Sequence, residues 1–295
     1  MNYQKRTRAE KIFNVFNITF LVVLSLLFLF PLYYIYVSAF TSETELMKNT
    51  ISLWPKEFSL EGFRFIFSSG NKVIPAFFLS VATTLTGTLQ SIIVICLFGY
   101  AMAKDNFPFK KLIMIIVVFT MVFNGGLIPT FLVMKNLHLL DSFYMLIIFH
   151  AFNAGNMVFM RNYFMTIPKS INESARIDGA NEFTILARIV IPISKPMIAC
   201  VVLFAAVGIW NDWTTALFYN PTYSIEPLQL VLKKVMTKID EILMTKANLG
   251  ALGRVVPQEC IKYATVVVVV TPILCVYPFL QKYFIKGSWI GGVKG

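Results

Sequence analysis

Long apolar runs alternate with short polar segments along this chain of 295 residues. A helix that crosses the hydrocarbon core of a membrane needs about 20 consecutive, mostly apolar residues. The pattern predicts an all-α polytopic membrane protein with six transmembrane helices, over residues 18–40, 74–103, 112–134, 142–164, 196–219 and 263–285. The second range is longer than one crossing requires, which favours a tilted helix or one that begins as a peripheral helix.

Composition agrees with this pattern. Hydrophobic residues make up 57% of the chain, charged residues make up 14%, and the mean hydropathy is +0.70. These values exclude an ordinary soluble globular protein. The basic N-terminus followed by an apolar run resembles a signal peptide, but the run is too long and no small-residue cleavage site follows it. We therefore expect the first run to be a membrane helix.

The distribution of basic residues predicts the orientation. Six crossings place both termini on one side with segments 104–111 and 165–195, and this side, counted with Arg161, carries 15 of the 26 Lys and Arg residues. The other 11 lie in longer loops and are largely offset by acidic residues. Because basic residues concentrate in short cytoplasmic loops, both termini and segment 165–195 are predicted to be cytoplasmic. The net charge of +11 then reflects topology and attraction to anionic lipid rather than nucleic-acid binding.

A polar island from Glu173 to Pro192 separates the fourth and fifth apolar runs. Ser170 and Glu173 have the spacing of a capping box, which predicts that Ser170 caps a short helix. Gly179 is predicted to end that helix in the left-handed conformation. Asn181 is predicted to cap a second helix, which Pro192 terminates. The island is thus expected to fold as a helix–turn–helix.

This island resembles the cytoplasmic EAA loop of ABC-importer permeases, whose pattern is Glu-Ala-Ala, three residues, Gly, nine residues and Ile-x-Leu-Pro. The chain has Glu173-Ser174-Ala175, Gly179 and Ile189-Val190-Ile191-Pro192 at those spacings. Ser174 and Ile191 depart from the pattern, both by small changes. A merely solvated amphipathic loop is the alternative interpretation of this segment.

The resemblance covers nearly all of the chain. The short basic N-terminus, the inward loop between the fourth and fifth helices and the long outer loop before the sixth are similar to the smaller membrane subunit of maltose-type carbohydrate importers. Within that class, residues 123–130 (FNGGLIPT) and the C-terminal GGVKG resemble the branch that serves oligosaccharides released from complex polysaccharides. The resemblance implies the type I ABC importer permease fold and sugar import across a bacterial cell membrane.

The resemblance also implies partners and roles for particular residues. The subunit would pair with a second homologous permease, two ATPase subunits and an extracytoplasmic sugar-binding protein, and ATP and Mg would bind to the ATPase rather than to this chain. Its ATPase-coupling residues would be Glu173, Ser174, Ala175, Asp178, Gly179, Ala180 and Pro192. Its C-terminal tail would reach the ATPase through Gly291, Gly292 and Lys294.

The sequence contains no recognisable catalytic pattern. It lacks the phosphate-loop motif GxxxxGK[ST], the metalloprotease motif HExxH and the nucleophile-elbow motif GxSxG. The four cysteines form no C-x-x-C pair, and His138 and His150 have no second ligand at useful spacing, so a structural role is expected for both histidines. We therefore expect no enzymatic activity in this chain, no bound cofactor and no metal site.

The outer half of the fifth predicted helix carries the candidate sugar-contacting residues Trp210, Asn211, Asp212 and Trp213. Aromatic rings can pack on the C–H faces of sugars, and an ionisable group near a membrane crossing is a functional candidate by default. The alternative is an aromatic belt at the membrane interface, with Asp212 in water. Asn153 and Asn156 are weaker candidates, which could equally well join helices by hydrogen bonds.

The predicted organisation is a cytoplasmic N-terminus over residues 1–17, a single transmembrane domain over 18–285 and a cytoplasmic tail over 286–295. The transmembrane domain includes the cytoplasmic loop 165–195 and an extracytoplasmic loop over 220–262, which is expected to meet the binding protein.

An ion-coupled secondary sugar transporter, with Asp212 as the coupling acid, is the alternative function. The sequence argues against it, because no internal repeat is visible and no acidic residue lies in the middle of a crossing. An intramembrane enzyme is a third possibility, but paired catalytic residues are missing from the sequence.

Overall fold

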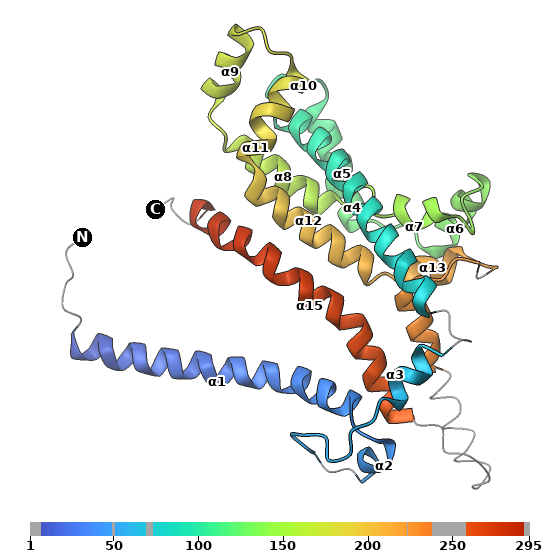
Figure 1. Ribbon diagram of the computed structural model, residues 1–295. Coiled ribbons are helices and arrows are strands. Elements are labelled where there is room, and N and C mark those ends of the chain that lie inside the picture. The colour runs from blue at the N-terminus through green and yellow to red at the C-terminus, as the bar shows by residue number, and fades with distance from the viewer. Residues whose placement is uncertain (1–6, 49–50, 69–72, 223, 238–257, 292–295) are drawn as a thin grey trace. The chain divides into compact units, whose positions relative to one another are not determined.

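The computed structural model describes residues 7–48, 51–68, 73–222, 224–237 and 258–291, with side chains up to residue 278 (Figure 1). Its helices are α1 (Arg8–Ala39), α2 (Glu43–Leu46), α3 (Glu61–Ile66), α4 (Val73–Ala103), α5 (Lys110–Val122), α6 (Leu127–Asn136), α7 (Phe143–Ile148), α8 (Ala154–Met165), α9 (Lys169–Ile177), α10 (Glu182–Ile185), α11 (Ile191–Ile193), α12 (Lys195–Trp210), α13 (Thr214–Tyr219) and α15 (Gln258–Gly291). A π-helical turn, Leu186–Val190, joins α10 to α11, and residues 228–237 are also helical. The described residues form no strand, so they confirm the helical class.

The chain divides into two compact units. The first contains residues 1–71 and 239–270, and the second contains residues 72–238 and 271–295. Helix α15 therefore contributes its first part to one unit and the rest to the other.

Three helices of the described chain are long and apolar enough to cross a membrane, namely α1, α4 and the part of α15 from Glu259 to Pro278. Two further candidates are bent pairs, α5 with α6 and the stretch Glu182–Ile193 with α12. The count is therefore three to five among the described residues, and the six predicted crossings are not confirmed.

The third predicted crossing, 112–134, is interrupted by a sharp bend. Helices α5 and α6 meet at 118°. Between them Gly126 has a φ of +87°, and the side-chain oxygen of Asn124 accepts a hydrogen bond from the Gly126 N–H at 2.9 Å. Glycine adopts this backbone conformation at little cost, so the sequence FNGG breaks the helix where an apolar count alone predicts continuity.

The fourth predicted crossing, 142–164, is also broken, into α7 and α8. Ser142 caps α7 by accepting a hydrogen bond from the Met145 N–H at 3.2 Å. Asn153 caps α8 by accepting one from the Asn156 N–H at 2.9 Å. Cap residues satisfy the free N–H groups of a helix start, which is why two short helices replace one long one here.

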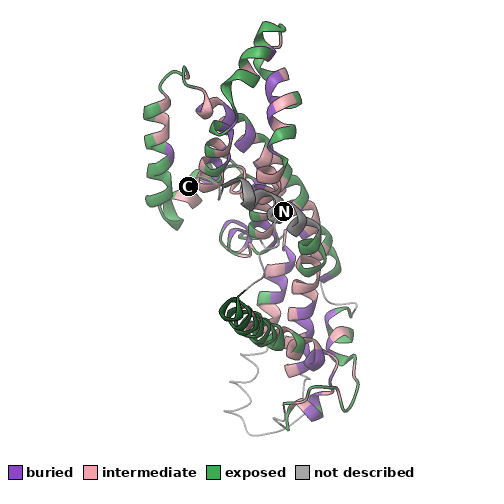
Figure 2. Cartoon of the chain, turned by 90° about the vertical axis from the view of Figure 1, so that its left-hand side faces the viewer, coloured by how far each residue is buried: buried purple, intermediate pink, exposed green. Residues whose placement is uncertain are grey.

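The first helix begins ten residues earlier than the predicted start at residue 18. The Thr7 N–H donates to the Glu10 carboxylate at 2.8 Å, and the Glu10 N–H donates to the Thr7 hydroxyl at 3.3 Å. This reciprocal capping box fixes the start of α1. Most of α1 is exposed despite its apolar composition (Figure 2), as expected of a helix surrounded by lipid or by another membrane subunit.

In the first unit, the loop region after α1 is fastened to the start of α15. The buried Glu43 carboxylate accepts hydrogen bonds from the Glu259 and Cys260 N–H groups at 3.1 and 3.0 Å. These donors belong to the first turn of α15, so Glu43 acts as a cap supplied from a distant part of the sequence. Gly62 of α3 packs directly on the same turn.

In the second unit, α4 packs against both α8 and α12. Their shared core contains the buried side chains Ile95, Met102, Met157, Met160, Ile185 and Val201. A second cluster joins α6, α7 and α13 around Tyr219, whose ring stacks on Phe149 with centroids 4.7 Å apart.

Gly62→Ala is predicted to destabilise the first unit. An added Cβ would lie 2.5 Å from the Cys260 carbonyl oxygen and 3.0 Å from the Ala264 Cβ, so backbone must move. Overpacking of this kind costs about 1–3 kcal/mol. The measurement is the Tm of the detergent-solubilised protein. Gly125→Ala is the matched control, because no atom lies within 4 Å of a Cβ built there. Equal Tm values for the two variants would contradict this account of the packing.

Candidate functional site

The polar island forms the helix–turn–helix that the sequence predicts. Helix α9 ends at Ile177, and Gly179, two residues further on, has a φ of +81°. The Gly179 N–H donates to the Arg176 carbonyl at 3.0 Å, and the Ala180 N–H donates to the Ala175 carbonyl at 2.9 Å. This pair of bonds is a Schellman motif, which satisfies the last carbonyls of a helix. The predicted left-handed role of Gly179 is confirmed.

The two predicted caps of this segment have different outcomes. Asn181 caps α10 as predicted, because its side-chain oxygen accepts from the Thr184 N–H at 2.8 Å. The prediction for Ser170 is wrong. Helix α9 starts at Lys169 directly after Pro168, and no side chain caps it. Ser170 therefore lies one position inside the helix, where it cannot act as the N-cap residue.

The second helix of the island ends at Ile193, one residue beyond the predicted terminus at Pro192. A π-helical turn over Leu186–Val190 precedes the proline. Proline supplies no N–H and its ring crowds the preceding turn of an α-helix, and a wider turn accommodates both effects. At Ser194 the chain then bends by 85° into α12.

Glu182 joins the island to the end of α4. Its carboxylate accepts a hydrogen bond from the Tyr100 hydroxyl at 2.7 Å and lies 2.8 Å from the Lys104 ammonium. Its other oxygen lies 2.8 and 2.7 Å from two guanidinium nitrogens of Arg176. Partial burial acts to raise the pKa of Glu182, but the bonds from Lys104, Tyr100 and Arg176 prevail and lower it to about 2. The carboxylate is therefore ionised at neutral pH and holds three elements together.

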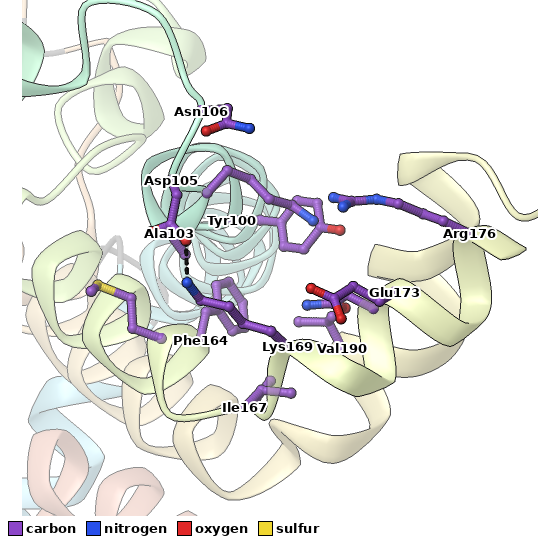
Figure 3. Close-up of a pocket in the computed structure, with 13 residues that line it drawn as sticks. Tyr100, Ala103, Asp105, Asn106, Phe164, Ile167, Lys169, Glu173, Arg176 and Val190 are labelled. Carbon is purple, nitrogen blue, oxygen red and sulfur yellow. Dashed lines mark hydrogen bonds and ion pairs between the residues drawn. The ribbon is translucent and has the colours of Figure 1, made fainter.

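A second ion pair joins α9 to the same region. The Lys169 ammonium pairs with the Asp105 carboxylate in the loop after α4 (Figure 3). Between these two connections lies a cleft of about 310 Å³, lined by the ends of α4 and α8 and by α9. Both charges of the Lys169–Asp105 pair are mostly exposed, so this pair orients the segment more than it stabilises it.

The predicted coupling residues do not all face the same way. Ala175 is buried, and it packs into the core shared by α4, α8 and α12. Glu173, Ser174, Asp178 and Gly179 are exposed, whereas Ala180 is partly buried. The small side chain of Ala175 thus permits α9 to lie close to its own protein.

Two exposed apolar residues of the island are absent from the sequence-based site. Ile177 is 86% exposed and Phe183 is 71% exposed. They flank the Gly179 turn in a segment that is otherwise charged. A contiguous exposed apolar patch marks an interaction surface, so these two large side chains are candidates for contact with a partner. The excess of large apolar residues on the polar turn was a signal available in the sequence.

The predicted sugar-contacting cluster is divided by the fold. Trp210 is buried, and its ring meets the Phe77 ring edge to face at 6.0 Å. It lines an almost entirely apolar groove of about 510 Å³ formed by α4, α12 and residues 272–277. This environment suits a packing residue.

Asn211 and Trp213 have other neighbours. The Asn211 side-chain amide donates to the Val207 carbonyl at 3.0 Å, and its oxygen accepts from Gln229 at 3.3 Å. The Lys233 ammonium lies over the Trp213 ring, 5.5 Å from its centroid. The three predicted side chains therefore do not converge on one cavity.

Asp212 is engaged by the fold itself. Its Oδ2 lies 2.9 Å from His150 Nε2. Its Oδ1 accepts from the Thr214 N–H at 3.0 Å, the Thr214 hydroxyl at 2.8 Å and the Thr215 N–H at 3.1 Å. These bonds shape the turn between α12 and α13 and join it to the connection between α7 and α8. The pairing agrees with a structural role for His150 and leaves Asp212 little capacity to bind a ligand directly.

The remaining predicted positions can be placed only in part. Gly291 is the last residue of α15, whereas Gly292 and Lys294 lie outside the described residues. Within the described part of the chain, no group of three or more His, Cys, Asp and Glu side chains could hold a metal ion.

Residues 95–289 match the family model described as binding-protein-dependent transport system inner membrane component. The chain is 39% identical to protein LplC of Bacillus subtilis (strain 168), over 98% of this chain and 97% of that protein. It is 37% identical to the polygalacturonan/rhamnogalacturonan transport system permease protein YtcP of the same strain, over 97% and 99%. A chain in the crystal structure of a bacterial ABC transporter involved in the import of the acidic polysaccharide alginate superposes with a TM-score of 0.78 and 30% identity, covering 95% of this chain and 99% of that one.

Glu182→Gln is predicted to loosen the island from α4. The amide keeps the shape of the protonated acid but loses both ion pairs, which are partly exposed and contribute about 1 kcal/mol together after solvent screening. In membrane vesicles that contain the protein, trypsin should cleave residues 169–188 several-fold faster in this variant, because cleavage follows local opening of the chain. In the parent protein the attachment of the island to α4 should weaken in the same way as the pH falls from 4.5 toward about 2, because protonation of Glu182 at its pKa removes both ion pairs.

Asp178→Asn is the matched control for this experiment. It also removes one negative charge from the island, but the Asp178 carboxylate makes no hydrogen bond or ion pair with the described residues. Cleavage rates that are equal in the two variants would show that Glu182 does not hold the island in place.

Proposed function

The chain belongs to the family of binding-protein-dependent transport system inner membrane components, and from that premise we propose that it forms half of the translocation path of an ATP-driven oligosaccharide importer. One relative reported above is a polygalacturonan/rhamnogalacturonan transport system permease protein, and another chain belongs to an ABC transporter involved in the import of alginate. The proposed substrate is an oligosaccharide released from a complex polysaccharide, since two of the three relatives serve polysaccharides. A second homologous permease would complete the path.

The exposure of the apolar side chains Ile177 and Phe183 is the main support for a role of the polar island in coupling to an ATPase. Both lie on the polar island, at the Gly179 turn. Exposure of these side chains to water is unfavourable by roughly 25 cal/mol per Å² of apolar surface, so a partner that covers them gains affinity. A separate ATPase subunit is the proposed partner, with the exposed Glu173, Ser174 and Asp178 available at the edge of the contact.

Because the island is attached to α4, a partner that moves the island would also move this helix. Glu182, Tyr100 and Lys104 connect the proposed docking surface to a membrane-spanning helix. Closure of the ATPase dimer would displace α9, and the displacement would pass to α4 through these bonds and through buried Ala175. Such a transition between two rigid packings would alternate inward- and outward-open states of the path.

The proposed topology retains six crossings and both termini in the cytoplasm. Residues 165–195 would face the ATPase, residues 220–262 would meet an extracytoplasmic sugar-binding protein, and the tail with Gly291, Gly292 and Lys294 would reach the ATPase. Lys169 and Arg176 of α9, together with Lys104 at the end of α4, support the cytoplasmic assignment of this end of the molecule. ATP and Mg would bind to the ATPase, and this chain would bind no cofactor.

Reconstitution of the purified complex in proteoliposomes tests the proposal. Uptake of labelled oligosaccharide should require ATP on the ATPase side and the sugar-binding protein on the other side. It should persist when ionophores abolish ion gradients. Uptake driven by an ion gradient without ATP would overturn the proposal in favour of a secondary transporter.

Gly179→Val is predicted to uncouple transport from ATP hydrolysis. A β-branched residue is strained at a φ of +81°, so the turn that presents Ile177 and Phe183 should change shape. Sugar-stimulated ATP hydrolysis and uptake should both fall at least about tenfold, an effect of 1.4 kcal/mol or more. Gly179→Asn should retain most activity, because asparagine tolerates this conformation. Unchanged stimulation in the valine variant would remove the turn from the mechanism.

Alanine substitutions at Trp210, Asn211 and Trp213 test whether these residues line the sugar path, as the sequence suggests. A lost stack or hydrogen bond should lower uptake by an amount equivalent to about 1–3 kcal/mol, with basal ATP hydrolysis retained. Because Trp210 is buried against Phe77, Trp210→Phe accompanies Trp210→Ala and separates packing from recognition. Near-normal uptake in Asn211→Ala and Trp213→Ala would assign the segment to the aromatic belt.

A further inference from the structure

The loop that follows α2 is fastened at its base to the end of α1. The Ser42 N–H donates to the Glu57 carbonyl at 3.0 Å, and the Ser59 N–H donates to the Phe40 carbonyl at 2.9 Å. Phe40 is the C-cap residue of α1. Both ends of the loop therefore meet at the end of this membrane-crossing helix, and the direction in which the loop projects from there decides its surroundings.

The tip of this loop, residues 51–54, lies beside α1 and not beyond its end. The Tyr33 hydroxyl donates a hydrogen bond to the Leu53 carbonyl at 2.5 Å. Tyr33 precedes the end of α1 at Ala39 by six residues, or about 9 Å along the helix axis. Helical side chains lean toward the N-terminus, so the hydroxyl is no closer to the helix end than Tyr33 itself. In Figure 1 the loop lies below the last part of α1.

The side chains at the loop tip are apolar and exposed. Ile51, Leu53 and Trp54 are 70%, 61% and 75% exposed, and residues 51–54 carry no charge. Leu29 and Phe30, one helical turn before Tyr33, are exposed as well. The loop tip thus continues the apolar surface of α1, and contact of this surface with water is unfavourable.

Backbone carbonyls of the loop tip are bonded within the protein. The Leu53 carbonyl accepts from Tyr33, and the Trp54 carbonyl accepts from the Ser52 hydroxyl at 2.5 Å. A loop in water needs neither bond, because water satisfies exposed carbonyl groups. Lipid offers no such donor at the depth of its acyl chains, so irregular backbone there must be satisfied by the protein. These bonds favour lipid over water as the surroundings of the loop tip.

Charged groups of the same loop gather at its base. The ammonium groups of Lys48 and Lys56 lie 2.8 and 3.3 Å from the carboxylate oxygens of Glu45, which is buried. The Ser42 hydroxyl donates to the Glu57 carboxylate at 2.7 Å. The loop is therefore divided into a polar base at the end of α1 and an apolar tip beside the preceding turns. A membrane interface has the same order of polarity along its depth.

We propose that the loop tip is an anchor in the membrane interface, with the side chains of Ile51, Leu53 and Trp54 among the lipids and the base of the loop in the headgroup region. Tryptophan rings are enriched at this depth, because one edge is polar and the rest is apolar. Tyr33 sets the depth of the loop tip by holding the Leu53 carbonyl. In the proposed topology this interface is the outer one. Interfacial anchors set the tilt and rotation of a membrane helix, so the loop tip fixes the position of α1 in the bilayer.

Fluorescence quenching of Trp54 tests the anchor. The complete importer is placed in lipid nanodiscs that contain either ordinary lipid or lipid brominated in its acyl chains near the headgroup, and iodide is the quencher in water. The Trp54 signal is the difference in fluorescence between the parent and Trp54→Phe, which cancels every other tryptophan of the complex. Brominated lipid should remove most of this signal, whereas iodide should leave most of it.

Two results would overturn the proposal. Quenching of the Trp54 signal by iodide and not by brominated lipid would place the loop tip in water. Resistance of the signal to both quenchers would show that a protein subunit covers the loop tip.

A second variant tests the part assigned to Tyr33. Tyr33→Phe removes the donor to the Leu53 carbonyl, so the loop tip should move toward water, the Trp54 emission should shift to longer wavelength and quenching by iodide should increase. Tyr34→Phe is the matched control, because it removes a hydroxyl from the next position of α1, whose ring packs edge to face on Tyr263 with centroids 6.0 Å apart. It should leave the Trp54 signal unchanged. Equal Trp54 emission in the two variants would show that Tyr33 does not set the depth of the loop tip.

Discussion

Every backbone N–H and C=O in the hydrocarbon of a membrane must find a partner within the protein, and this constraint organises the structure. It explains the helical class, and it also explains where helices are interrupted. At the bend after α5 the Asn124 side chain satisfies the Gly126 N–H, and before α8 Asn153 satisfies the Asn156 N–H. Each interruption of a predicted crossing carries the polar side chain that makes it tolerable.

Local chemistry was predictable where neighbouring residues alone decide it. Gly179 and Asn181 end and start helices as the sequence indicates, because a left-handed glycine and an asparagine cap act within a few residues. The prediction that Ser170 caps α9 was wrong for an equally local reason. Pro168 supplies the extended residue from which α9 begins, so the helix starts before the serine can cap it. Apolar runs predicted that helices exist, but not that FNGG or the Asn153 cap divides them.

Pairs formed by the fold could not be predicted from the sequence. Glu182 meets Tyr100 across 82 positions, and His150 meets Asp212 across 62. Each residue has several potential partners by chemistry, and only the packing of α4 and α12 selects one. The expected structural role of His150 agrees with the pairing it makes, whereas its partner was read as a sugar or ion site. Trp210 and Trp213 were grouped by adjacency, although their rings enter separate environments.

Helix α4 is the element that connects the polar island to the core of the second unit. Tyr100 and Lys104 bind Glu182 near one end of α4. Buried Ile95 and Met102 pack against α8, the island and α12. A close-packed core of this kind resists continuous deformation, so a displaced island either moves α4 as a body or shifts it to another discrete packing.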